Sequence, residues 1–285
     1  MLTGSSVLEL KYNMKININL FGLNISSLWI YFAVAFGLTW LVEIAWSLSG
    51  ISLGSSSGQA LLCLATSGPA TAAIGLTFLT QDKAGRRDFL LRIIDIRRIR
   101  AGWYLVIFLF PPALYGLAAL SDVLLGGSGA TWGKTIGQLT IIPSLLTIFL
   151  TPLFEELGWR GYALDKLQSR WSALSSSLIL SIVWALWHLP LSFIKGTYQY
   201  SLGFGSPEFW TFMIGFVPVT ILFTWIYNNN CRSTLSAILF HCVINGTLEL
   251  LTLSGLAYAY SIVLWFAAAV AVTIIWGPRR PGSSC

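Results

Sequence analysis

The chain has 285 residues, 55% of them hydrophobic and only 10% charged, with a mean hydropathy of +0.74. Soluble domains carry about 25% charged residues, so this composition excludes an ordinary soluble protein. The net charge of +6 does not indicate a nucleic-acid partner, because its 17 lysines and arginines follow the topology. With both termini in the cytoplasm, all except Lys134 and Lys195 fall on the inner side of the cell membrane, as the positive-inside rule expects.

Apolar stretches of about 20 residues, the length that crosses a bilayer core, recur along the chain. They predict an all-α, polytopic membrane protein with about eight transmembrane helices. In chain order they cover 28–48, 58–80, 102–124, 143–165, 173–194, 208–228, 233–253 and 257–276. Their continuity argues against an outer-membrane barrel, whose strands alternate over about ten residues. We expect one transmembrane domain over 28–276, a cytoplasmic segment over 1–27 and a cytoplasmic tail over 277–285.

The first stretch is longer than the apolar core of a signal peptide, which has about 7–15 residues. It also contains Glu43. We therefore expect a retained membrane anchor. A start at Met1 or at Met14 remains open.

A charged segment separates the second stretch from the third. Residues 81–100 hold basic and acidic side chains, with Phe89, Leu90, Ile93 and Ile94 between them at roughly helical spacing. This pattern is typical of an amphipathic helix on the cytoplasmic leaflet, attracted to anionic lipid. A solvated connector is the alternative.

The fourth stretch ends in FEELGWRGYAL, residues 154–164, with three charged side chains in an apolar helix. An ionisable group at a helix centre costs about 2.5–3.5 kcal/mol on insertion scales, so each of the three needs a reason. Glu156 and Arg160 are four residues apart and share a helix face, so we expect them to pair. Glu155 is rotated by about 100° and is expected to stay free as a proton acceptor. One buried charge network of all three is the alternative.

The chain has two histidines, and both fall inside expected membrane helices. His188 follows Trp184 by one turn. His241, Asn245 and Glu249 line one face of another helix, so that face must turn toward the other helices. An imidazole and an amide one turn apart can donate hydrogen bonds to one oxygen, as in an oxyanion hole. Packing and interhelical hydrogen bonding are the alternatives for these residues.

These motifs resemble the signature of the CPBP intramembrane proteases, also called the CAAX-protease and bacteriocin-processing family. The resemblance rests on EELGWRGYAL, on WALWHLP and on His241 four residues before Asn245, in this order between about 151 and 245. It departs from the family pattern at Trp184, where the family usually has phenylalanine.

The resemblance implies an endopeptidase that hydrolyses a peptide bond near the C-terminus of a membrane-associated peptide or protein, with or without a lipid anchor. The protease core would cover about 143–253. Glu155 would be the general base, with His188 helping to hold and activate the water. His241 and Asn245 would stabilise the oxyanion.

The resemblance gives Glu156 and Arg160 a supporting role, in which they shape the site or bind the substrate chain. Zinc is the open cofactor question. Glu155, His188 and His241 would be its ligands, since three protein ligands and a water are usual in catalytic zinc sites. No His-Glu-x-x-His helix is present, and a carboxylate with an imidazole can activate water unaided, so we favour a metal-free mechanism.

Two other functions stay open at this point. A catalytically silent scaffold, such as a bacteriocin-immunity protein, could keep the same fold. A proton-coupled transporter would use intramembrane glutamate and histidine as relays.

Overall fold

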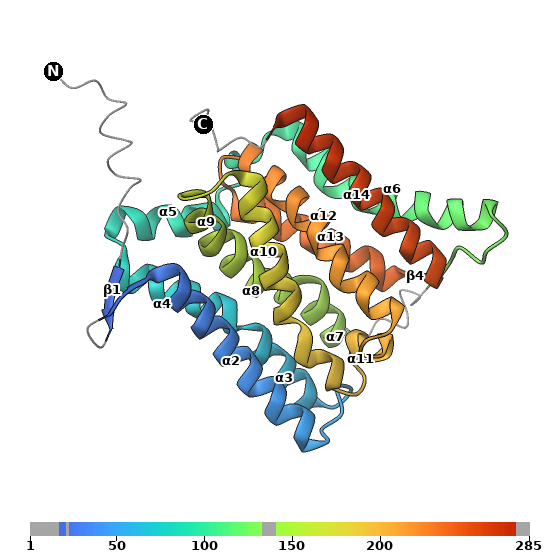
Figure 1. The fold of residues 1–285 in the computed structure, drawn as a ribbon, viewed down its shortest axis with the longest axis horizontal. Helices are drawn as coiled ribbons and strands as arrows, with labels where there is room; N and C mark the ends of the chain where they lie inside the picture. Colours follow the sequence, from blue (N-terminus) through green and yellow to red (C-terminus); the bar gives the residue numbers. More distant parts are fainter. Residues whose placement is uncertain (1–16, 21–22, 133–140, 278–285) are drawn as a thin grey trace.

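The computed structural model describes residues 17–20, 23–132 and 141–277, and helices make up most of it (Figure 1). In chain order the helical segments are α2 (Ser27–Ser49), α3 (Ser56–Thr66), α4 (Gly68–Thr80), α5 (Lys83–Ile94), η1 (Ile96–Arg98), α6 (Ala101–Leu124), α7 (Ile141–Leu145), η3 (Leu146–Leu150), α8 (Thr151–Gly158), η4 (Trp159–Ala163), α9 (Leu164–Gln168), α10 (Ala173–Trp187), η5 (Leu189–Phe193), α11 (Tyr198–Leu202), α12 (Pro207–Asn229), α13 (Thr234–Leu250) and α14 (Gly255–Trp276).

Two short antiparallel ladders accompany the helices. Strand β1 (Asn17–Leu20) pairs with β2 (Leu23–Ser26), and β3 (Ala130–Trp132) pairs with β4 (Leu251–Leu253). The second ladder joins the end of α6 to the start of α14, which also lie side by side (Figure 1). Neither ladder enters the helical bundle, so the all-α prediction is confirmed.

Each apolar stretch predicted to cross the membrane is largely helical in the structure, although the seventh ends in strand β4. Five helices are long and apolar enough to be spans by themselves, and α3 with α4 would be a sixth if that bent pair crosses as one. Helix α13 is apolar but shorter, and the fourth predicted stretch is divided into short helical pieces. The chain is thus a polytopic membrane protein, and the count of eight spans stays a prediction.

The second predicted span is broken at Ser67. Pro69 follows in the first turn of the new helix, where its missing N–H is tolerated, and α3 and α4 meet at an angle of 40°. Gly68 allows α4 to approach α2 closely, since a Cβ there would lie 2.3 Å from the Thr39 hydroxyl oxygen and 2.8 Å from the carbonyl oxygen of Ala35. The break therefore brings α4 against α2.

The fourth predicted stretch runs as one continuous helical path from Ile141 to Gln168, but its winding changes twice. The segments η3 and η4 are π-helical and stand on either side of α8. Such single-turn π segments occur often at functional sites. Pro152, in the first turn of α8, cannot donate a backbone hydrogen bond to the preceding turn. This arrangement fixes the direction in which the α8 side chains point.

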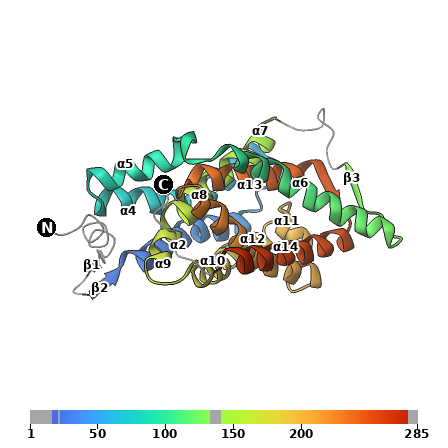
Figure 2. The same ribbon diagram turned by 90° about the horizontal axis from the view of Figure 1, so that it is seen from above.

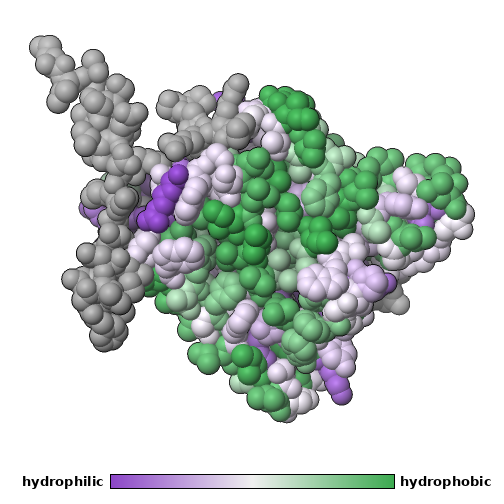
Figure 3. All heavy atoms as spheres, viewed as in Figure 1, coloured by the Kyte–Doolittle hydropathy of each residue, from purple (hydrophilic) through white to green (hydrophobic). Residues whose placement is uncertain are grey.

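The bundle is a flattened layer of helices when seen from above (Figure 2). Helix α4 packs between α2 and α8, while α10, α12, α14 and α6 follow one another as contacting neighbours. Most of the surface in Figure 3 is apolar, and α14 exposes Val263, Val270, Ile274 and Ile275. An exposed surface of this kind suits contact with lipid.

The charged segment after α4 forms helix α5, which Asp82 caps by accepting a hydrogen bond from the Gly85 amide. This helix packs on the bundle, because Phe89 and Arg92 are buried. Arg92 forms an ion pair with Asp165 of α9 at 2.5 Å. The segment is therefore a docked helix and not a solvated connector.

Candidate active site

The two adjacent carboxylates lie on α8 and are both buried, Glu155 at 5% exposure and Glu156 at 0%. Glu156 Oε1 accepts a hydrogen bond from Arg160 at 2.9 Å, which is the pair expected from the four-residue spacing. The same oxygen lies 2.8 Å from Nδ1 of His241 on α13. Glu156 thus connects two helices through one oxygen atom.

Arg160 has no exposed surface, and aromatic rings surround its guanidinium group. The guanidinium carbon lies 4.3 Å from the centre of the Trp184 ring and 4.0 Å from that of Phe223. Cation–π contacts of this kind strengthen when they are desolvated. The charge of Arg160 is therefore held by Glu156 on one side and by two ring faces on the others.

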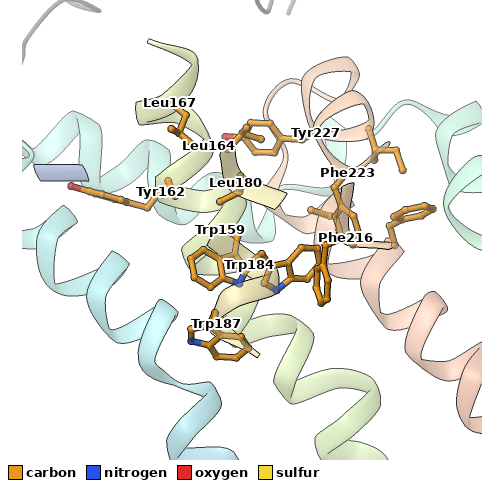
Figure 4. Close-up of a cluster of buried hydrophobic side chains, with 14 of the residues drawn as sticks. Trp159, Tyr162, Leu164, Leu167, Leu180, Trp184, Trp187, Phe216, Phe223 and Tyr227 are labelled. Carbon is orange, nitrogen blue, oxygen red and sulfur yellow. The ribbon is translucent and has the colours of Figure 1, made fainter. Parts of the chain in front are cut away.

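The sequence suggested that Glu155 would be free, but in the structure it has a partner. Trp184 of α10 donates its indole N–H to Glu155 Oε2 at 2.6 Å. The same indole ring contacts His188, with ring centres 6.1 Å apart, and His241, at 5.6 Å. In Figure 4, Trp184 lies between Trp159 and Phe216 in the middle of the aromatic cluster. One side chain therefore contacts the carboxylate and both imidazoles.

His188 stands directly after α10, where the helix tightens. Its amide bonds to the carbonyl of Ala185, which leaves the Trp184 carbonyl without its usual helical donor. The His188 ring lies with Nδ1 2.9 Å from that carbonyl oxygen. Because a carbonyl can only accept, Nδ1 carries the proton, and Nε2 of a neutral His188 is an acceptor.

Asn245 bonds to a backbone carbonyl and not to His241. Its side-chain amide donates to the Thr147 carbonyl in η3 at 2.9 Å, and the Thr151 hydroxyl donates to the same oxygen at 3.0 Å. Pro152 lies one π turn after Thr147 and has no N–H to offer it. The amide of Asn245 has a second N–H, so its predicted oxyanion role stays a prediction.

Residues 137–247 match the sequence model of a family described as type II CAAX prenyl endopeptidase, Rce1-like. A protein of Methanococcus maripaludis named CAAX prenyl protease 2 is 36% identical over 175 residues. Residues 137–247 are thus similar to the endopeptidases of the CPBP, or CAAX protease, family. The alignment covers 59% of this chain and 64% of the archaeal protein, so it spans less than two thirds of that relative's length.

The predicted site residues lie in one region but do not form a metal centre. Among the residues that the structure describes, no three His, Cys, Asp or Glu side chains are grouped closely enough to hold a metal ion. Glu155, His188 and His241 therefore do not fit the zinc site that the sequence kept open.

Sequence reasoning did not assign several residues that enclose this site. Tyr31 of α2 stacks on Tyr162 and meets Trp159 edge to face, with ring centres 5.1 Å and 5.9 Å away. It approaches α8 at Gly158, where a Cβ would lie 2.4 Å from the Tyr31 hydroxyl. The glycine after the glutamate pair was the available signal, because it permits a close crossing of helices.

Glu43 also lies in this region. It is fully buried on α2 and close enough to Glu155 for a direct electrostatic interaction. The sequence showed only that a carboxyl stands inside the first span. Its neighbour on α8 could not be deduced, because that requires the packing of α2 and α4 against α8.

Proposed function

We propose that the chain is an intramembrane endopeptidase that hydrolyses a peptide bond near the C-terminus of a membrane-associated peptide or protein. The similarity to CAAX proteases, the apolar helices and the buried carboxylates support this proposal. The observation that carries it is Trp184, which donates to Glu155 while its ring contacts His188 and His241. A base and two imidazoles around one indole are a suitable arrangement for activating water.

Glu155 acts as the general base in this proposal. Its Oε2 is held by Trp184, and Oε1 is then free to accept a proton from water. Nε2 of His188 is an acceptor in the tautomer that its Nδ1 contact requires, so it orients the second hydrogen of the same water. The water oxygen attacks the peptide carbonyl carbon, the C–N bond breaks, and Glu155 passes the proton to the leaving nitrogen.

His241 and Asn245 act as the oxyanion donors. Because Nδ1 of His241 is directed to Glu156, only Nε2 is available for the oxyanion. That nitrogen carries a proton when Nδ1 is also protonated, so His241 donates as an imidazolium. The Glu156 carboxylate stabilises this charged form, and Arg160 fixes the position of Glu156. Asn245 contributes its second N–H.

The substrate is a chain attached to the membrane. The name of the archaeal relative refers to a prenyl protease, which makes a peptide prenylated near its C-terminus the first substrate to test. Cleavage of an unlipidated membrane peptide would show that the lipid is not required.

The test measures cleavage of a prenylated peptide library and its unlipidated counterpart in proteoliposomes. Glu155→Gln and His188→Ala are expected to lower the rate by about 10²–10⁴-fold, the usual contribution of a positioned acid–base group. Glu208→Gln is the matched control, because Glu208 is exposed at the start of α12. Cleavage that persists in either site variant would refute the assigned roles. A folded wild-type protein that cleaves nothing would favour the silent scaffold or immunity protein.

A further inference from the structure

Glu43 has an unusual environment among the described acidic residues. Its side chain has no exposed surface, and neither carboxylate oxygen has a hydrogen-bond partner within the part of the chain that the structure describes. A buried carboxyl without a partner is unfavourable, because it loses its hydration and gains nothing in return. A buried acceptor of this kind points to a ligand that comes from outside the chain.

The surrounding contacts keep Glu43 inside the bundle. One turn earlier on α2, the Thr39 hydroxyl donates to the Ala65 carbonyl of α3 at 2.7 Å. The Trp40 indole donates to the Trp187 carbonyl at the end of α10 at 3.2 Å. One turn later, the Trp46 indole donates to the Ile51 carbonyl at 2.9 Å. Helix α2 is therefore tied to α3 and to the end of α10 just before Glu43, which holds the carboxyl inside the bundle.

The position of Glu43 relates it to the proposed chemistry. Trp40, three residues before Glu43 on α2, donates to the carbonyl of Trp187, the residue before His188, and Glu43 lies within electrostatic reach of Glu155. The other buried acid of the site, Glu156, is already matched by Arg160 and His241. Glu43 is thus the described carboxyl near the base that has both oxygens available for a new partner.

The proposed hydrolysis produces a cation at this place. Water supplies the oxygen of the new C–O bond, the C–N bond breaks, and both water protons end on the leaving nitrogen, one of them by way of Glu155. The released fragment therefore carries a new ammonium group beside Glu155, in a bundle of low polarity. An ammonium in such surroundings needs a counter-ion.

We infer that Glu43 binds the newly formed ammonium group of the released peptide, a site that rests on the proposed endopeptidase function. The carboxylate of Glu43 accepts N–H bonds from the ammonium without exchanging a proton with it. Charge-assisted hydrogen bonds of this type are the strong ones, and a water-poor site increases their effect. In this role Glu43 binds the product, and Glu155 remains the general base.

The experiment measures direct binding of two probes to the full chain in nanodiscs. The probes are an apolar tripeptide with a free amino terminus, Val-Leu-Leu, and the same tripeptide with an acetylated amino terminus. Wild type is expected to bind the free-amine peptide at least about tenfold more tightly, the usual effect of a hydrogen bond to a charged group. Glu43→Gln should abolish that preference at nearly unchanged side-chain volume, and Glu208→Gln should keep it.

Two results would overturn the inference. One is a wild-type protein that binds both peptides equally, and the other is a Glu43→Gln variant that keeps the preference for the free amine. If Glu43→Gln does not fold, Glu43→Asp replaces it. This variant keeps the charge but withdraws it by one methylene, so the preference should fall without disappearing, and an unchanged preference would again overturn the site.

A cleavage assay in the same nanodiscs separates this inference from the proposed function. Cleavage by wild type without a preference for the free amine overturns the ammonium site alone. A preference that depends on Glu43, in a protein that cleaves no substrate, overturns the endopeptidase and leaves the ammonium site supported.

Discussion

Replacement of Trp184 by phenylalanine isolates the hydrogen bond on which the proposed base depends. Trp184→Phe removes the indole N–H that lies 2.6 Å from Glu155 Oε2 and keeps an aromatic ring between Phe216 and Phe223. Phenylalanine is also the residue that the CPBP pattern usually has here, so the fold should accept it. The change therefore acts mainly on the orientation of Glu155.

The expected loss follows from the type of bond that is removed. A hydrogen bond to a charged group contributes about 1.5–3 kcal/mol, which corresponds to a fall of about 10- to 150-fold in kcat/KM. The fall should stay smaller than that of Glu155→Gln, because the base itself remains. The assay is the initial rate of peptide cleavage in proteoliposomes, with the thermal unfolding midpoint measured on the same preparations.

Trp225→Phe is the matched control for this substitution. The indole N–H of Trp225 has no partner within the described residues, and its ring packs on Trp103 and Trp276 away from the candidate site. Trp225→Phe makes the same change of side chain at a position where the indole N–H does not bond to the base. An unchanged kcat/KM in folded Trp184→Phe, or equal falls in both variants, would refute the reasoning.

Three further predictions concern the charge pair, the helix crossing and the metal question. Arg160→Met should destabilise the protein by about 3–5 kcal/mol, because it leaves the buried Glu156 with His241 alone and without its arginine partner. Adding Glu156→Gln should recover part of the loss in thermal unfolding, and strictly additive effects would contradict the pairing. Gly158→Ala should lower stability by about 1–3 kcal/mol or more through its clash with Tyr31, whereas Gly75→Ala, which meets nothing within 4 Å, should be neutral or stabilising in the same measurement. Dialysis against a chelator should leave peptidase activity unchanged, and a loss that zinc restores would show that a metal takes part.

The helical segments could be predicted from the sequence because membrane helices carry a strong one-dimensional signal. Runs of about 20 apolar residues are recognisable without any partner. The break at Ser67 was missed because averaging hydropathy over a window conceals the helix-starting dipeptide Gly68-Pro69. The π segments were missed because the choice between two windings depends on contacts with neighbouring helices.

The candidate site was predictable where it depends on spacing within one helix. The pairing of Glu156 with Arg160 follows from a separation of four residues and is present in the structure. The contacts of Glu156 with His241, of Glu155 with Trp184 and of Asn245 with a backbone carbonyl each join different helices. Such contacts depend on how the helices are rotated against one another, and the spacing of residues in a single sequence does not show that rotation. The catalytic roles stay predictions.

The two π segments around α8 have a consequence for changes in chain length. Each π turn accommodates one residue more than a regular turn, so a single deletion in η3 would let that segment return to ordinary α-helical winding. A deletion between Pro152 and Phe154, where the winding is already α-helical, has no extra residue to lose and would rotate everything after it by about 100°, the angle of one helical residue. Glu155 and Glu156 would swing away from Trp184 and His241, although no residue of the site had changed. Helix α8 should therefore accept substitutions far more readily than insertions or deletions, whereas η3 can lose one residue.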